Sequence, residues 1–157
     1  MHTLAGPSDF PTTRWTLVVA AADTQFRLPF TSLGAVPELA SSFFLPRAAG
    51  SRLASELLLL GHPFDALKAQ RAGLVNEVVF PGEELPLARQ WSRQLASLAP
   101  ASVQATKQLL RQAQQDGLAD AIAREGAALV TALGSAELKE ASDAFLEKRR
   151  PDFSSFH

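Results

Sequence analysis

The hydrophobic pattern of this chain changes near residue 83, and this change most limits the folds open to it. Before that point, apolar runs such as 16–23 (TLVVAAAD) and 73–80 (GLVNEVVF) alternate with short helical segments. Short apolar runs rich in β-branched residues are typical of strands buried in a parallel sheet. From Glu84 onward, apolar residues recur only at helical spacing. The sequence therefore predicts an α/β part followed by a helical part.

Local signals place several boundaries within the first part. Segment 24–30 (TQFRLPF) predicts a second extended stretch, and Pro37 is suited to open a helix with Glu38 in its first turn. Ser51 is a candidate cap for the next helix, which Gly61 would end, and Asp65 is a candidate cap for a short helix to residue 72. The helix after Ser51 is expected to place three leucines on its inner face: Leu53, Leu57 and Leu60.

Four amphipathic helices are predicted in succession after residue 83, the second restarting at Pro100. Their apolar stripes are Leu87, Trp91, Leu95 and Leu98; Val103, Leu110 and Ala113; Leu118, Ile122, Leu129 and Leu133; and Leu138, Ala141 and Phe145.

Composition excludes several classes of function. The 157-residue chain is of single-domain size, is 46% hydrophobic and carries a formal net charge of −1, so neither nucleic acid nor a membrane is an expected partner. It contains no cysteine, and His2, His62 and His157 lie far apart, so no metal site is expected and each histidine is assigned to the surface. No glycine-rich nucleotide-binding motif and no secretory signal are present. These features are typical of a cytoplasmic globular protein.

Glu38 is the one charged residue between Arg27 and Arg47, in a stretch of apolar and small residues. Its simplest interpretation is structural, because an acidic residue in the first turn of a helix complements the helix dipole. The alternative is a catalytic carboxylate whose apolar surroundings exclude water. The residues by themselves leave both interpretations open.

The segments 26–50 (FRLPFTSLGAVPELASSFFLPRAAG) and 54–79 (ASELLLLGHPFDALKAQRAGLVNEVV) resemble the crotonase superfamily, which includes enoyl-CoA hydratases and isomerases. The similarity runs from about Leu17 to the closing 145–153 (FLEKRRPDF) and includes Pro100 and Lys107. It implies the C-terminal part of a crotonase-like β/α spiral fold. The expected organisation is an unmatched segment 1–16, a partial α/β core 17–82 and a helical, oligomer-forming region 83–157.

Within the superfamily, the stretch around Pro37 is most similar to Δ3,Δ2-enoyl-CoA isomerases, in which the catalytic glutamate directly follows a proline. This resemblance implies that Glu38 is the base that moves a proton while a 3-enoyl-CoA becomes a 2-enoyl-CoA. Hydratases carry a glutamate where this chain has Phe30, and they need a second glutamate upstream. Isomerase is therefore the first expectation, and enoyl-CoA hydratase is the alternative.

The resemblance also implies the partners and the remaining site residues. The substrate is an acyl-CoA thioester, which itself carries the coenzyme, so no further cofactor is expected. A homo-oligomer, trimer or hexamer, is expected. The candidate substrate-binding residues are Phe30, Leu33, Pro37 and Phe145, although ordinary burial tendencies favour the hydrophobic core over the pocket wall for Phe30 and Phe145. Lys148 and Arg149 are candidate contacts for CoA phosphates, with a solvated chain end as the alternative.

The resemblance leaves the first half of the family pattern unmatched. In crotonase-like proteins that half supplies both backbone N–H groups of the oxyanion hole, and one such donor is typically worth on the order of 10² to 10³ in rate. The chain is therefore expected to be N-terminally truncated and inactive by itself, so whether it is an enzyme is left open. The competing interpretation is a non-catalytic fragment that acts as an oligomerisation module.

Overall fold

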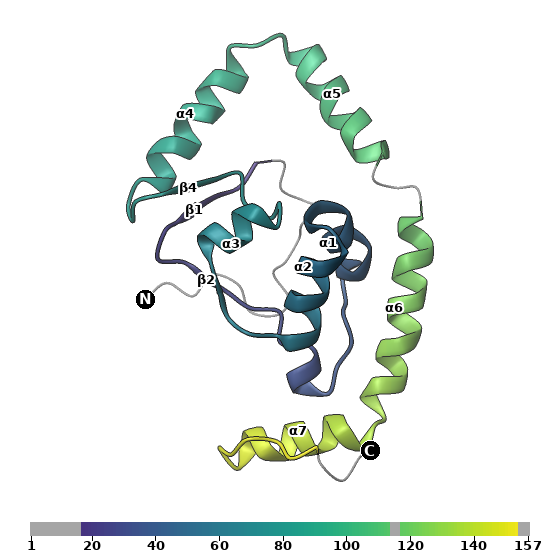
Figure 1. Ribbon diagram of the computed structural model, residues 1–157. Helices are drawn as coiled ribbons and strands as arrows, with labels where there is room; N and C mark the ends of the chain where they lie inside the picture. Colours follow the sequence, from purple (N-terminus) through teal and green to yellow (C-terminus); the bar gives the residue numbers. More distant parts are fainter. Residues whose placement is uncertain (1–16, 114–116, 154–157) are drawn as a thin grey trace. The chain divides into compact units, whose positions relative to one another are not determined.

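The computed structural model describes residues 17–113 and 117–153 (Figure 1). The chain divides into two compact units, Met1–Phe26 with Phe64–Ala119 and Arg27–Pro63 with Asp120–His157. In both units, segments far apart in the sequence come together.

A parallel pair of strands lies in the first unit. Strand β1 (Val19–Ala21) pairs with β4 (Glu77–Val79), so that Ala20 lies opposite Val78. Figure 1 shows the two strands side by side. The Val18 N–H donates to the Asn76 side-chain oxygen at 2.7 Å, which extends the pairing beyond the strand end. The predicted strands at 16–23 and 73–80, the first of them expected to be parallel, are therefore confirmed.

A second, antiparallel pair leads into a short helix of the same unit. Strand β2 (Gln25–Phe26) pairs with β3 (Phe64–Asp65), and the rings of Phe26 and Phe64 stack with centroids 5.7 Å apart. Helix α3 (Ala66–Arg71) follows directly, and the Asp65 carboxylate accepts the Lys68 N–H at 2.7 Å. This confirms the predicted cap. Three alanines of this region are fully buried: Ala66, Ala69 and Ala72.

Four helices occupy the second half of the chain, as predicted: α4 (Glu84–Ala96), α5 (Pro100–Ala113), α6 (Leu118–Leu133) and α7 (Ala136–Leu146). Pro100 is the first residue of α5, where its missing N–H costs no hydrogen bond. Helix α7 is capped by Ser135, whose hydroxyl accepts the Leu138 N–H at 3.1 Å. In the described residues, no helix is both long enough and apolar enough to cross a membrane.

The second unit contains a 3₁₀ turn, η1 (Thr31–Leu33), and helix α1 (Ser41–Ala49). Helix α2 (Ser51–Ser55) then runs into a π-helical turn, η2 (Glu56–Leu60), which ends at the left-handed Gly61 as predicted. The predicted cap at Ser51 is wrong, because Gly50 holds the N-cap position and no side chain caps this helix.

The π-helical turn changes which leucines are buried. Leu57 and Leu58 are buried, whereas Leu60 is 56% exposed. The predicted inner face included Leu60 because it assumed 3.6 residues per turn throughout. A π-helical turn contains more residues per turn than an α-helix, so it shifts which residues lie on the buried face of the helix.

Candidate active site around Glu38

Glu38 lies in the loop before α1 and not within a helix. Helix α1 begins only at Ser41, and no acidic residue lies in its first turn. Leu39 and Ala40 intervene with φ angles of 55° and 57°, the left-handed region, which a continuing right-handed helix cannot contain. The prediction that Pro37 opens the helix is therefore wrong. The helix-dipole interpretation of Glu38 is also wrong, because it required Glu38 to lie in the first turn of the helix.

The Glu38 backbone and side chain have different surroundings. Its carbonyl oxygen accepts the Ser41 N–H at 3.0 Å and the Ser41 hydroxyl at 2.6 Å. Its side chain is half-buried, and within the described part of the chain no hydrogen bond or ion pair involves its carboxylate. A carboxylate with no such partner can accept a proton without first breaking a protein contact.

The segment leading to Glu38 is held by side chains that donate to backbone carbonyls. Arg27 Nε donates to the Gly61 oxygen at 3.0 Å, and the Thr31 hydroxyl donates to the Leu59 oxygen at 2.9 Å. These bonds tie the start of the segment to the end of η2. The Phe30 carbonyl then closes a tight turn by accepting two backbone N–H groups, at 3.0 and 2.9 Å.

The predicted substrate-binding residues fall into two groups. Phe30 is buried, Pro37 is half-buried and Leu33 is 41% exposed, and all three belong to the segment that carries Glu38. Phe145 lies on α7 with its side chain 79% exposed. The core interpretation thus fits Phe30 but is wrong for Phe145, because the buried residues of α7 are Ala141 and Ala144.

The two predicted CoA-binding cations differ in their contacts. The Arg149 guanidinium donates to the Glu140 carboxylate, with one contact at 3.0 Å, and to the Glu147 carboxylate at 2.6 Å. These bonds raise the pKa of Arg149 further above its already high value. They also lower the pKa of Glu140 to about 2, helped by the Asp152 N–H. Arg149 therefore ties the chain end to α7, whereas Lys148 is exposed in the left-handed region.

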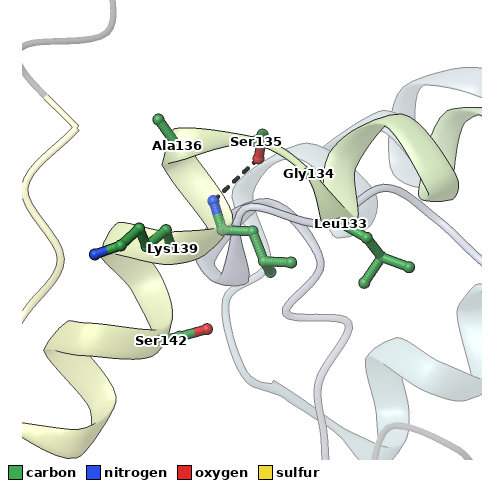
Figure 2. Close-up of a pocket in the computed structure, with 7 residues that line it drawn as sticks. Leu133, Gly134, Ser135, Ala136, Lys139 and Ser142 are labelled. Carbon is green, nitrogen blue, oxygen red and sulfur yellow. Dashed lines mark hydrogen bonds between the residues drawn. The ribbon is translucent and has the colours of Figure 1, made fainter.

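A cavity of about 580 Å³ lies at the turn between α6 and α7 (Figure 2). Ser135 and Lys139 contribute to its lining, and Lys139 is paired with Asp143 at 2.7 Å. None of the site residues predicted from the sequence lines it. The cavity therefore contains no predicted site residue.

Metal-binding side chains do not gather in the described residues, which contain no group of three or more His, Asp or Glu side chains placed to hold an ion. His62 is exposed, as expected, and His2 and His157 lie outside the described residues.

The sequence interpretation missed Glu125 of α6. This residue is only 8% exposed, and its carboxylate accepts hydrogen bonds at the start of α1. One signal could have revealed it, since Glu125 falls three residues after Ile122 and four before Leu129 on a predicted apolar stripe. A charged residue in such a stripe requires a specific partner.

Known proteins resemble this chain in both sequence and fold. A sequence model described as enoyl-CoA hydratase/isomerase matches residues 16–155. The chain belongs to this family. It is 38% identical over 138 residues to the 2,3-dehydroadipyl-CoA hydratase of Escherichia coli (strain K12), covering 87% of this chain and 54% of that protein.

Other members of the enoyl-CoA hydratase/isomerase family agree. The short-chain-enoyl-CoA hydratase of Clostridium acetobutylicum is 31% identical over 132 residues, covering 84% of this chain and 51% of that protein. The crystal structure of an enoyl-CoA hydratase/isomerase from Pseudoalteromonas atlantica T6c superposes with a TM-score of 0.83 at 40% identity, covering 91% of this chain and 58% of that one. The predicted crotonase-like fold is confirmed, and the chain spans about half the length of the curated relatives that it matches.

Proposed function

We propose that this chain carries the catalytic base of an enzyme that transfers a proton on an enoyl-CoA thioester, and that the base is Glu38. The observation that supports this most directly is that the backbone and the side chain of Glu38 differ in how firmly they are held. The backbone of the loop is fastened on both sides of Glu38, while the Glu38 carboxylate is half-buried and free of protein partners among the described residues. A fixed backbone with an unengaged carboxylate is the arrangement that general base catalysis requires.

Isomerisation is the first candidate reaction, because a single carboxylate can perform it. Glu38 takes a proton from C2 of a 3-enoyl-CoA, the electron pair passes into a dienolate conjugated with the thioester, and the same carboxyl returns the proton to C4. The double bond then lies between C2 and C3. The substrate carries the coenzyme, so the reaction needs no other cofactor. Buried Phe30 contributes an apolar wall that disfavours water.

Hydration is the second candidate, and the names of the relatives favour it. The proteins from Escherichia coli and Clostridium acetobutylicum are both called hydratases. Hydration adds the hydroxyl of water to C3 and a proton to C2 of a 2-enoyl-CoA, and Glu38 would take part in that proton transfer. Both reactions place the same residue against the same carbon, so the assignment of Glu38 does not depend on the choice between them.

The test replaces Glu38 by glutamine in the full chain that the gene encodes and compares turnover of 3-enoyl-CoA and 2-enoyl-CoA. We expect kcat to fall by several orders of magnitude with CoA-ester binding retained, because an amide cannot accept the proton. Glu83→Gln, an exposed site in the first unit, makes the same charge change and is the control. Equal turnover by Glu38→Gln would overturn the assignment. If the chain without any substitution neither bound CoA esters nor turned over either substrate, a non-catalytic role as an oligomerisation module would be favoured.

A further inference from the structure

Among the residues that the structure describes, Glu125 is the one charged residue that is buried. It projects from α6, and its two carboxylate oxygens accept three hydrogen bonds from the start of α1. The donors are the Ala40 N–H at 2.6 Å, the Ser42 N–H at 2.8 Å and the Ser42 hydroxyl. Removing a carboxylate from water is costly unless such donors compensate it. The contact is therefore a specific one, between residues 85 positions apart in the chain.

Capping alone does not require so remote a partner. The first N–H groups of a helix lack partners, and a serine, threonine or aspartate at the N-cap commonly satisfies them. The N-cap of α1 is Ala40, which has no side chain able to do so. Its left-handed backbone places its own N–H within reach of Glu125, whereas an ordinary N-cap side chain bonds the N–H groups that follow it. The Glu125 carboxylate thus binds two different backbone groups. One is the Ala40 N–H, which belongs to the left-handed turn, and the other is the Ser42 N–H, which belongs to the first turn of α1.

That turn is the strained part of the loop. Leu39 and Ala40 are two consecutive left-handed residues that are not glycine. Each costs roughly 1 to 2 kcal/mol relative to the right-handed conformation. Such strain persists only where surrounding contacts impose it, and it is concentrated at functional sites. Here it directly follows Glu38 and sets the direction in which the chain leaves that residue.

The other end of the loop is also held by a C-terminal helix. Gly34 is left-handed, and its backbone approaches that of Leu138 in α7 so closely that a Cβ atom would not fit. The loop is therefore contacted by α7 at Gly34 and by α6 at Ala40, and Glu38 lies between these two contacts.

From this arrangement we infer that Glu125 is a positioning residue for Glu38. It holds the Leu39–Ala40 turn in its left-handed form and so fixes the Glu38 carboxylate relative to the substrate. Glu125 is not a second catalytic acid, because protein donors already engage both of its oxygens. The inference rests on the proposed role of Glu38 for its catalytic meaning, but the structural part can be measured without any activity.

The first measurement is hydrogen–deuterium exchange of the full chain at the amides of Ala40 and Ser42. Glu125→Gln keeps the size of the side chain but turns an amide N–H toward the donors. We expect exchange at these two amides to accelerate at least tenfold, with exchange in α7 unchanged. The control is Asp120→Asn, an exposed carboxylate on the same helix, which should leave these amides unaffected. Unchanged exchange in folded Glu125→Gln would overturn the inference.

If Glu125→Gln does not fold, Ser42→Ala replaces it. This variant removes the hydroxyl donor and leaves both N–H contacts. We expect a smaller acceleration of exchange, several-fold, at the same two amides. No change there would also overturn the inference.

The second measurement is steady-state kinetics on an enoyl-CoA substrate. A displaced base slows the chemical step, and a misplacement of about 1 Å can cost about 10²-fold in rate. We expect Glu125→Gln to lower kcat by about this factor with KM within about twofold, whereas a loss of global structure would lower the amount of active enzyme in parallel with the folded fraction. Faster amide exchange together with unchanged kcat would refute the positioning of a catalytic base while leaving the structural contact intact. If Glu38→Gln also retained turnover, the proposed function itself would have failed.

Discussion

The backbones of Gly34 and Leu138 meet so closely that a Cβ atom on Gly34 would lie 2.7 Å from the Leu138 nitrogen. Real Cβ atoms do not approach backbone atoms to this distance, so one of the two segments would have to move. Gly34 also has a φ of 64°, which side chains disfavour. The contact therefore depends on glycine for two separate reasons.

Gly34→Ala is expected to destabilise the second unit by both routes. Gly61→Ala is the matched control, because Gly61 has nearly the same φ and ψ as Gly34 (59° and 21° against 64° and 19°), while the nearest backbone atom would lie 3.1 Å from its added Cβ. It therefore reports mainly the backbone cost. We expect the free energy of unfolding, from urea titration, to fall by about 1 to 3 kcal/mol more for Gly34→Ala than for the control. Equal losses would show that α7 does not press on the loop.

Acid is expected to release the end of the chain from α7. The Arg149 guanidinium and the Asp152 N–H lower the pKa of Glu140 from 4.5 to about 2. Because the folded-state pKa is the lower one, the contact stabilises the folded chain fully above about pH 4.5. Its contribution declines below that pH and is lost once the pH has fallen through about 2.

The measurement is an NMR titration of the Glu140 side-chain carboxyl carbon. We expect a midpoint near 2, and Glu140→Gln should remove the acid-dependent change in the amide signals of Asp152 and Phe153. A midpoint near the usual 4.5 would mean that the Arg149 contact does not persist in solution.

The product mixture is expected to distinguish the two candidate reactions. Phe30 is buried and non-ionisable at the position where the resemblance places a hydratase glutamate. We therefore expect the full chain that the gene encodes to convert 3-enoyl-CoA into 2-enoyl-CoA and to form little 3-hydroxyacyl-CoA from it. Chromatography of the CoA esters measures both products. A predominance of 3-hydroxyacyl-CoA would reverse the order of the candidates in favour of hydration.

Self-association is expected because the helices of the second half expose large apolar side chains. Clusters of such side chains on one face mark contact surfaces between proteins. The most exposed examples are Leu85 and Leu109 in the first unit and Val130, Leu133, Phe145 and Leu146 in the second. Sedimentation at micromolar concentrations should show a trimer or hexamer. A compact monomer across that range would contradict the prediction.

The sequence was sufficient where the structure depends on neighbouring residues. The Asp65 cap, the stop at Gly61 and the start of α5 at Pro100 each follow from the chemistry of one residue and a few that follow it. The strands β1 and β4 were indicated by apolar runs without alternation, although nothing in the sequence identified them as partners.

The failures at Ser51 and Leu60 are also local, whereas the failure at Pro37 comes from a contact over long sequence separation. Pro37 carries a legitimate helix-start signal, but the turn at Leu39 and Ala40 delays α1 to Ser41. Nothing within a few residues of Ala40 indicates that turn, because its hydrogen-bond acceptor is Glu125. The core interpretation of Phe145 failed because α7 buries Ala141 and Ala144 and leaves Phe145 exposed.

The hydrogen bond between Ala40 and Glu125 also limits when the contacts around Glu38 can form during synthesis of the chain. The two residues are 85 positions apart, and a ribosome adds roughly 5 to 20 residues per second, so roughly 4 to 17 seconds pass between their appearances. Throughout that interval the nascent chain contains Glu38 but lacks the carboxylate that holds the following turn. The turn cannot gain this hydrogen bond until α6 has left the ribosome, so the contacts around the proposed base are complete only late in synthesis.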